Sequence, residues 1–318
     1  MAAQSGSRIV VYAALAGNFL IAVTKFIAAA FTGSSAMLSE GVHSLVDTGN
    51  ELLLLYGLHR AAKPPDREHP FGHGRELYFW SFVVAVLIFA LGAGVSIYEG
   101  VRHVMQPEPM ENATVNYIVL GLSIVFETAS WLVALREFRR EKGELGYLAA
   151  IRESKDPTTF TVLVEDSVAL LGLLIALAGI LAAQALDMPV LDGVASIGIG
   201  LLLAATAFFL ARESKNLLLG EQALPAVQQA ILLAAQADEE IRHVNGVSTS
   251  QIGPHAVIAA LSAEFEDHLT TPQIEACIER VEAAVRSRHP EVLSIFIKPQ
   301  TEATWRERVA EIRRLGAG

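Results

Sequence analysis

Four polar side chains in the second apolar stretch of the chain could together act on a cation. They are Glu40, His43, Asp47 and Asn50. Their spacing of three or four residues places them on one face of a helix. His43 and Asp47, at positions i and i+4, can hold one divalent cation; a buried His–Asp hydrogen bond that braces helix packing is the alternative. Since the middle of this stretch contains no basic partner and charge at membrane depth is costly, we favour metal binding.

A second ionisable pair lies in the fifth apolar stretch, where Glu165 and Asp166 are adjacent. On a helix they point about 100° apart, so at least one of them must face a bundle interior or a water-filled cavity. Like charges this close repel each other, which suits a site that exchanges metal for protons. The alternative is that a carboxyl stays protonated and hydrogen-bonds a neighbouring helix, and for Glu165 the two readings are equally favoured.

A zinc site takes four ligands in a tetrahedral arrangement. His43, Asp47 and Asp166 supply three, and Glu165 or water could supply the fourth. The imidazole favours Zn²⁺ over Mg²⁺ or Ca²⁺, which prefer oxygen ligands, but it does not exclude Fe²⁺, Co²⁺ or Mn²⁺.

Three further ionisable residues of the apolar stretches bear on the interpretation. Glu127 has no partner evident from the sequence, and its role stays open. Asp192 stands at the start of the sixth stretch, where an acid favours the helix dipole, and we expect a structural role. Lys25 lies near enough to the end of the first stretch to reach the interface by snorkelling.

Six apolar stretches position these residues, and each is long enough to cross a bilayer as a helix, which takes roughly 20 residues. They are Arg8–Phe31, Ser35–His59, Glu76–His103, Ala113–Phe138, Thr158–Ala185 and Val190–Arg212. The breaks between them contain Gly or Pro, which interrupt helices. These breaks are Thr32-Gly33-Ser34, Lys63-Pro64-Pro65, Pro107-Glu108-Pro109, Asp156-Pro157 and Met188-Pro189.

The composition is that of a membrane protein, with 52% hydrophobic and 18% charged residues among 318 and a mean hydropathy of +0.41. It excludes disordered and fibrous chains. A net charge of −10 without a basic face excludes nucleic acid as a partner. The single cysteine, Cys277, excludes an internal disulfide and is expected to be a small buried hydrophobe.

The distribution of Lys and Arg sets the orientation. Up to Arg212, every basic residue except Lys25 and Arg102 falls on one side of the predicted spans. Both termini should therefore be cytoplasmic. No transit sequence is evident, so a bacterial inner membrane is favoured over an organellar one.

The hydrophobic pattern of the chain after Arg212 is typical of a small soluble domain with the order α-β-β-α-β. The expected helices are Pro225–Ala237 and Pro272–Arg288, and the expected strands are Val244–Gln251, Ala256–Glu266 and Val292–Lys298. We therefore predict a six-helix transmembrane domain at 1–212, a ferredoxin-like α/β cytoplasmic domain at 213–300, and a charged tail at 301–318 that forms a short exposed helix.

The chain resembles the cation diffusion facilitator family, which exports zinc and related divalent metals. The matching motifs are Gly33-Ser34-Ser35, His43-Ser44-Leu45-Val46-Asp47, His69-Pro70-Phe71-Gly72-His73-Gly74 and Ile97-Tyr98-Glu99-Gly100-Val101. The resemblance implies a homodimer with one transport site per protomer between the second and fifth spans, and exchange of metal for protons by alternating access.

The fifth span departs from the pattern of most family members, which carry HxxxD there as well. Asp166 occupies the Asp position, but Val162 stands where the His is found. The sequence Glu165-Asp166-Ser167 instead resembles the branch that contains the mitochondrial-type zinc transporter.

Two further segments can be compared with the family. Asp66, His69 and His73 match a loop that holds an accessory metal in some members. A loop packed by Phe71, with its histidines hydrogen-bonded at an interface, is an equally favoured alternative. The cytoplasmic domain resembles a dimerisation module without metal sensing, because its histidines, His243, His255, His268 and His289, are scattered.

The sequence thus predicts a secondary transporter that exchanges cytoplasmic Zn²⁺ for external H⁺, with zinc as its substrate and no prosthetic group. Transport of Mn²⁺, Fe²⁺ or Co²⁺ by the same mechanism is the alternative, followed by a non-transporting membrane scaffold. An intramembrane metalloenzyme is disfavoured, because the chain contains no HExxH, GxSxG or GxxxxGK[ST] motif.

Overall fold

The computed structural model describes residues 2–107 and 113–315, which form two compact units. One unit comprises the chain up to Ala62 together with Glu76–Lys215. The other comprises Lys63–Arg75 and the chain from Asn216 onward. The loop between the second and third predicted spans therefore belongs, by its contacts, with the C-terminal unit, which the sequence did not suggest.

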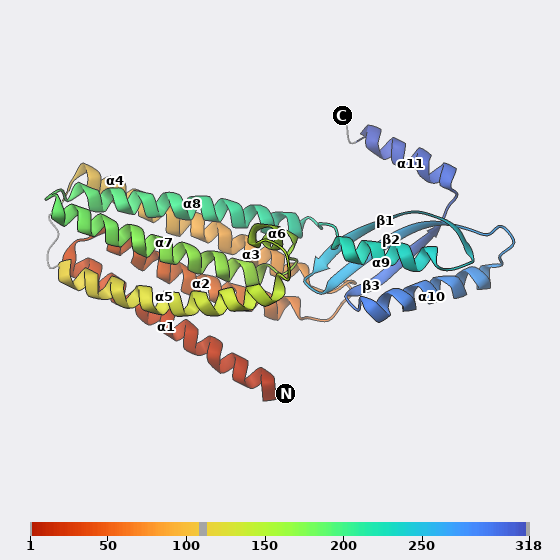
Figure 1. Ribbon diagram of the computed structural model, residues 1–318, viewed down its shortest axis with the longest axis horizontal. Coiled ribbons are helices and arrows are strands. Elements are labelled where there is room, and N and C mark those ends of the chain that lie inside the picture. The colour runs from red at the N-terminus through yellow and green to blue at the C-terminus, as the bar shows by residue number, and fades with distance from the viewer. Residues whose placement is uncertain (1, 108–112, 316–318) are drawn as a thin grey trace. The chain divides into compact units, whose positions relative to one another are not determined.

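Long helices that run side by side make up the first unit (Figure 1). They are α1 (Ala2–Thr32), α2 (Ser35–Ala61), α3 (Arg75–Leu87), the π-helical segment η1 (Ile88–Ala93), α4 (Gly94–Met105), α5 (Ala113–Glu141), the short α6 (Tyr147–Glu153), α7 (Pro157–Ala185) and α8 (Val190–Leu218). All six predicted stretches are helical; the third runs through α3, η1 and α4, and α6 was not predicted. Because α2 packs against α1, α4 and α7, its polar face lies inside the bundle.

Two helix starts show why the chain breaks where it does. The Ser34 hydroxyl caps α2 by accepting a hydrogen bond from the Met37 N–H at 3.1 Å. The Asp156 carboxylate caps α7, directly before Pro157, by accepting from the Thr158 N–H at 2.9 Å. In the predicted break at Pro107–Pro109, the last two residues lie outside the described residues.

Within the described residues, four helical segments are long and apolar enough to cross a membrane. They are Arg75–Met105, Thr114–Arg136, Phe160–Ala185 and Val190–Leu218. In α1 the apolar stretch is the shorter Asn18–Thr32. The helix α2 is less apolar than these four segments, because polar residues along one of its faces interrupt its apolar sequence. The outer surface of the bundle carries many exposed large hydrophobic side chains, including Leu20, Phe31, Phe126, Leu174, Leu201 and Phe208, as expected of helices that face lipid.

The second unit contains a three-stranded sheet of order β1-β2-β3, with strands β1 (Ile241–Gly253), β2 (Ala256–Phe265) and β3 (Val292–Pro299). β1 and β2 are antiparallel, with Val247 opposite Leu261, and β2 and β3 are parallel. The helices are α9 (Pro225–Gln236), α10 (Thr271–Arg288) and α11 (Glu302–Leu315). The predicted order α-β-β-α-β and the helix in the tail are confirmed.

The two helices α9 and α10 contact each other and share one hydrophobic core with the sheet. Ile231 of α9, Val281 of α10 and Leu261 of β2 are buried in it. Alternation along β2 directs Val257, Ala259, Leu261 and Ala263 to this core.

Cys277 lies in the same core, as predicted, with 0% of its surface exposed. Burial raises the pKa of the Cys277 thiol to about 12, and the Asp238 carboxylate adds to this effect. A raised thiol pKa favours the protonated form, which is not nucleophilic. We expect Cys277 to resist a disulfide-exchange reagent at neutral pH until the domain unfolds, as a titration with increasing denaturant can check. Rapid stoichiometric labelling of the folded chain would contradict this.

Candidate functional site

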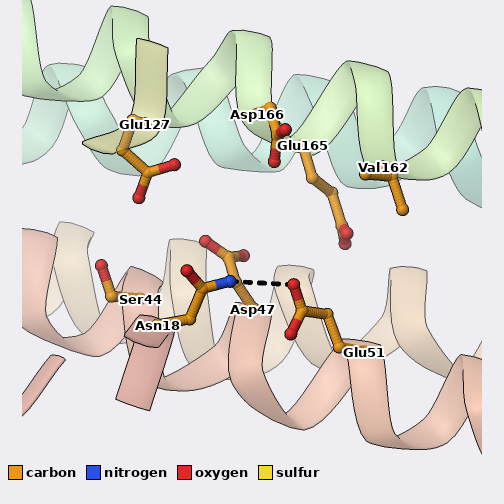
Figure 2. Close-up of a pocket in the computed structure, with 8 residues that line it drawn as sticks. All are labelled: Asn18, Ser44, Asp47, Glu51, Glu127, Val162, Glu165 and Asp166. Carbon is orange, nitrogen blue, oxygen red and sulfur yellow. Dashed lines mark hydrogen bonds between the residues drawn. The ribbon is translucent and has the colours of Figure 1, made fainter. Parts of the chain in front are cut away.

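A pocket inside the first unit is lined by residues from four helices (Figure 2). They are Asn18 of α1, Ser44, Asp47 and Glu51 of α2, Glu127 of α5, and Val162, Glu165 and Asp166 of α7. Five of these eight residues are carboxylates, and none is Lys, Arg or His. Figure 2 shows the carboxylates of α2 on one side of the pocket and those of α5 and α7 on the other, directed toward the same space. Such a concentration of acidic groups attracts a cation.

Uncharged donors orient two of the pocket carboxylates. The Asn18 amide donates to Glu51 Oε1 at 2.8 Å, as the dashed line in Figure 2 shows. The Asn50 amide, which is fully buried, donates to Glu165 Oε1 at 2.8 Å. Because both donors are neutral, they position the carboxylates without compensating their charge.

The contact between α5 and α7 orients Asp166. The Ser130 hydroxyl of α5 donates to Asp166 Oδ2 at 3.0 Å. One residue further along each helix, the Trp131 indole N–H of α5 donates to Ser167 Oγ of α7 at 2.9 Å. Both members of the adjacent pair Glu165–Asp166 therefore face the pocket, where the sequence required this of only one.

His43 does not line the pocket. Its imidazole is buried (3% exposed), with Nδ1 at 3.2 Å from Asp47 Oδ1. It therefore reaches the pocket through Asp47. Among residues 2–107 and 113–315, the groups that gather three ligand atoms within 4.8 Å of one another do not include His43, Asp47, Glu165 and Asp166. A metal ion held by all four would require their ligand atoms to come closer together.

Two pocket residues escaped the sequence analysis. Glu51 lies four residues after Asp47 and eight after His43, so the helical periodicity that identified those two could also have identified it. For Asn18, no signal in the sequence indicated that α1 would contribute to the site. Glu127, whose role was left open, faces the same pocket.

Lys25 contradicts the sequence analysis. It is fully buried rather than snorkelling to the interface, and its Nζ lies 3.1 Å from Glu40 Oε2. The polar face of α2 thus does have a basic partner, supplied by α1. A lysine fifteen residues away in sequence can reach Glu40 because the short turn at Gly33 makes α1 and α2 antiparallel neighbours.

Asp192 is structural, as predicted, but it stabilises a different helix. Its carboxylate accepts hydrogen bonds from the Ser34 hydroxyl at 2.8 Å and from the N–H groups of Ser35 at 2.5 Å and Ala36 at 3.3 Å. It therefore satisfies free N–H groups at the first turn of α2 rather than of its own helix.

A second cluster lies in the loop Lys63–Arg75. Asp66, His69 and His73 bring ligand atoms within 4.8 Å of one another. Asp66 Oδ1 lies 3.3 Å from His69 Nδ1, and Asp66 Oδ2 lies 3.0 Å from His73 Nε2. Two imidazoles and a carboxylate in this arrangement suit a divalent metal. The sequence identified all three residues.

The packing part of the alternative account of this loop is also present. Phe71 packs edge-to-face on Phe296 of β3, with ring centroids 6.4 Å apart. A side chain at Gly74 would collide with the backbone of Ile252 in β1, so only glycine permits this close approach. Packing of the loop and clustering of its histidines are therefore compatible.

Asp66 is prepared for metal binding by its own loop. Hydrogen bonding from the His69 N–H, at 2.6 Å, lowers the pKa of Asp66 to about 2. The carboxylate is thus ionised at any pH above that value, so protonation of the imidazoles limits binding on acidification. We expect Asp66→Ala to weaken Zn²⁺ binding at this loop by about tenfold or more. Calorimetry on the full chain in detergent can measure this, with exposed His268→Ala as the control; equal affinity in both variants would contradict it.

A third group of donor atoms, Asp238, Glu240 and Cys277, lies in the second unit. The Arg280 guanidinium donates to both Asp238 oxygens at 2.9 Å and to Glu240 at 2.6 Å. This bidentate pairing lowers the pKa of Asp238, and the one guanidinium occupies oxygens of both carboxylates. The group is therefore an ion-pair network rather than a cation site.

The histidines of the second unit are dispersed. They are His243, His255, His268 and His289. In the part of the chain that the structure describes, none belongs to a group of three ligand atoms close enough for one ion. The His289 imidazole instead lies 3.0 Å from the Glu291 carboxylate.

Comparison with known proteins identifies relatives over most of the chain. Residues 11–219 match the cation efflux transmembrane domain. The mitochondrial proton-coupled zinc antiporter SLC30A9 of Mus musculus is 34% identical over 264 residues, which are 82% of this chain and 47% of that protein. The cation-efflux pump FieF of Cronobacter sakazakii is 30% identical over 290 residues, which are 89% of this chain and 90% of that protein.

This chain thus spans about half the length of the SLC30A9 relatives that it matches. A solved structure of the MamM CTD in a nickel form covers 24% of this chain and 98% of its own, with 23% sequence identity and a TM-score of 0.23.

Proposed function

This chain belongs to the cation diffusion facilitator family, whose cation efflux domain it carries, and from that premise we propose that it is a secondary transporter exporting Zn²⁺ in exchange for H⁺. The observation that carries the proposal is the pocket of five carboxylates without a basic side chain. It lies inside a helical unit with an apolar outer surface. Zinc as substrate is supported by the zinc antiporter relatives.

The transport site that we propose is formed by His43, Asp47, Glu165 and Asp166. Three of the four line the pocket, and His43 contacts it through Asp47. A metal ion binds neutral imidazole and ionised carboxylates, so loading displaces protons and protonation favours release. The same side chains then couple the two fluxes without a separate proton relay. Closure of α2 toward α7 around the ion would complete its coordination.

We further propose six spans, in which α1 and α2 cross the membrane beside the four more apolar helical segments. Glycine at close helix contacts suits the rocking of one helix group against another. The second unit is proposed as a cytoplasmic dimerisation domain, and the chain as a homodimer in a bacterial inner membrane with both termini cytoplasmic. The loop cluster of Asp66, His69 and His73 is proposed as an accessory metal site.

Transport of a harder cation, such as Mn²⁺ or Fe²⁺, is the second candidate. It is favoured by one observation: every potential metal-binding atom that lines the pocket directly is oxygen, and hard cations prefer oxygen ligands.

The proposal is tested by Zn²⁺ uptake into proteoliposomes under an imposed pH gradient. We expect the purified chain to move Zn²⁺ only while protons can move in the opposite direction. Unlike an enzyme, it should leave any added organic molecule chemically unchanged. A parallel series with Mn²⁺ decides between the two candidate substrates. A purified wild type that moves no metal, together with metal tolerance in cells that survives Asp47→Ala, would support a scaffold instead.

Glu165→Gln decides whether this residue is a ligand. Glutamine can keep the hydrogen bond with Asn50 but removes the charge. We expect the initial rate of Zn²⁺ uptake to fall by about tenfold or more, because ligand and supporting-shell changes at metal sites usually cost 10- to 100-fold. Asn50→Ala, which removes the tether but keeps the charge, should have the smaller effect. An unchanged rate in Glu165→Gln would show that the carboxyl only hydrogen-bonds a neighbouring helix.

A further inference from the structure

A buried ion pair beside Ser44, one of the residues that line the pocket, has no part in the mechanism above. Lys25 and Glu40 are both fully buried. Besides contacting Glu40, the Lys25 ammonium donates to the Ser44 hydroxyl at 2.7 Å. Ser44 lines the carboxylate pocket, so the ammonium lies one hydrogen bond away from the pocket lining. Among residues whose burial the structure describes, Lys25 is the one fully buried lysine or arginine.

The side chains around this ammonium form a set that could itself hold a divalent cation. Glu40, His43 and Ser44 stand at positions i, i+3 and i+4, which share one face of α2. Glu40 Oε1 and His43 Nε2 are buried atoms with no hydrogen-bond partner. Buried polar atoms are normally paired, so these two are available to a ligand that replaces Lys25.

The helix α7 leaves room beside this set. A side chain at Gly172 would place its Cβ 2.5 Å from Glu40 Oε1. Glycine there keeps the unpaired oxygen free of steric contact at the interface of α2 and α7. The same interface carries Asp47 and Asp166, so the second set continues the proposed transport site along α2.

We propose that Lys25 is a tethered competitor of the transported cation: its ammonium occupies the acceptors Glu40 and Ser44, and a metal ion that leaves the pocket along α2 must compete with it. The inference rests on the proposed transport function. By compensating the charge of Glu40 in an ion pair, Lys25 prevents the metal from binding at Glu40 and His43 and so favours release.

Removal of the ammonium should therefore trap the metal. With Lys25 replaced, Glu40 is a buried charge without a partner, which attracts a cation strongly. Tighter binding in an intermediate lowers the apparent KM and also slows turnover. A merely structural role predicts a different pattern, in which fewer folded molecules lower kcat and leave KM unchanged.

The test is Zn²⁺ transport by the full chain in proteoliposomes over a range of Zn²⁺ concentrations. We expect Lys25→Met to lower both KM and kcat by about tenfold. This is the change in affinity that corresponds to one hydrogen bond to a buried charged group. Lys25→Gln, which keeps hydrogen-bond donors but loses the charge, should change both in the same direction and serves if Lys25→Met does not fold. The double variant Lys25→Met with Glu40→Gln should return both constants to within about threefold of the wild type, because neither charge remains.

Either of two results overturns the inference: an unchanged KM in folded Lys25 variants, or a low KM that persists in the double variant. The wild type and Asp47→Ala separate this failure from that of the proposed function. If the wild type transports Zn²⁺ and Asp47→Ala does not, while the Lys25 variants keep the normal KM, then this inference alone is wrong. If the wild type moves no metal, both are wrong.

Discussion

Replacement of Asp47 with alanine is expected to reduce the rate of Zn²⁺ transport by about 100-fold or more. Mutation of residues that only support metal ligands already lowers metal affinity or activity by about 10- to 100-fold. Asp47 is the residue that links the two parts of the proposed site. Its carboxylate lines the pocket opposite Glu165 and Asp166, and it lies 3.2 Å from the His43 imidazole. Its loss removes one ligand and leaves His43 without its partner.

The measurement is the initial rate of Zn²⁺ uptake by proteoliposomes that contain equal amounts of folded protein. Glu153→Ala is a matched control, because Glu153 is an exposed carboxylate on α6 in the same unit, outside the pocket. We expect the control to transport at the normal rate. Comparable rates in the two variants would remove Asp47 from the transport site.

The second large effect is on stability, at the contact of α4 and α8. A Cβ at Gly100 would lie 2.7 Å from both the side chain and the backbone N of Ile197, and 2.8 Å from the Gly193 carbonyl oxygen. The two backbones therefore touch, and Gly100→Leu must force the helices apart. We expect a loss of about 3 kcal/mol or more, at the upper end for overpacked sites. This corresponds to a fall of about 10 °C in the melting temperature.

Gly121→Leu is the control for this effect, because a Cβ at Gly121 on α5 meets nothing within 4 Å. Both variants replace a helical glycine with the same residue, so the intrinsic gain in helix propensity is common to them. Thermal unfolding in detergent compares the two. If Gly100→Leu and Gly121→Leu have the same melting temperature, then the close contact of α4 and α8 does not constrain the fold.

Much of the fold could be predicted because its signals are local. Apolar length identified all six long helical segments, and strong punctuation such as Ser34 and Asp156-Pro157 placed their starts. The strands of the second unit were recognised from β-branched runs. The short α6 and the π-helical segment η1 were not, because neither has a distinct periodicity in so few residues.

The pocket could be predicted only in part, since it depends on contacts between helices. Helical spacing identified Asp47, and a pair of adjacent carboxylates identified the face of α7 that carries Glu165 and Asp166. The same spacing paired His43 with Asp47, and the structure places the His43 imidazole 3.2 Å from the Asp47 carboxylate but outside the pocket lining. The buried partnership of Lys25 with Glu40 was missed because periodicity within one helix says nothing about its neighbour.

If metal and protons exchange at the carboxylate pocket, addition of Zn²⁺ must drive proton movement. Proteoliposomes with an internal pH dye and no imposed gradient are exposed to Zn²⁺, with the wild type compared with the double variant Asp47→Ala and Asp166→Ala. We predict a proton flux opposite to the Zn²⁺ flux in the wild type and none above the protein-free background in the double variant. Zinc entry without proton movement, or a proton flux that persists in the double variant, would contradict the account.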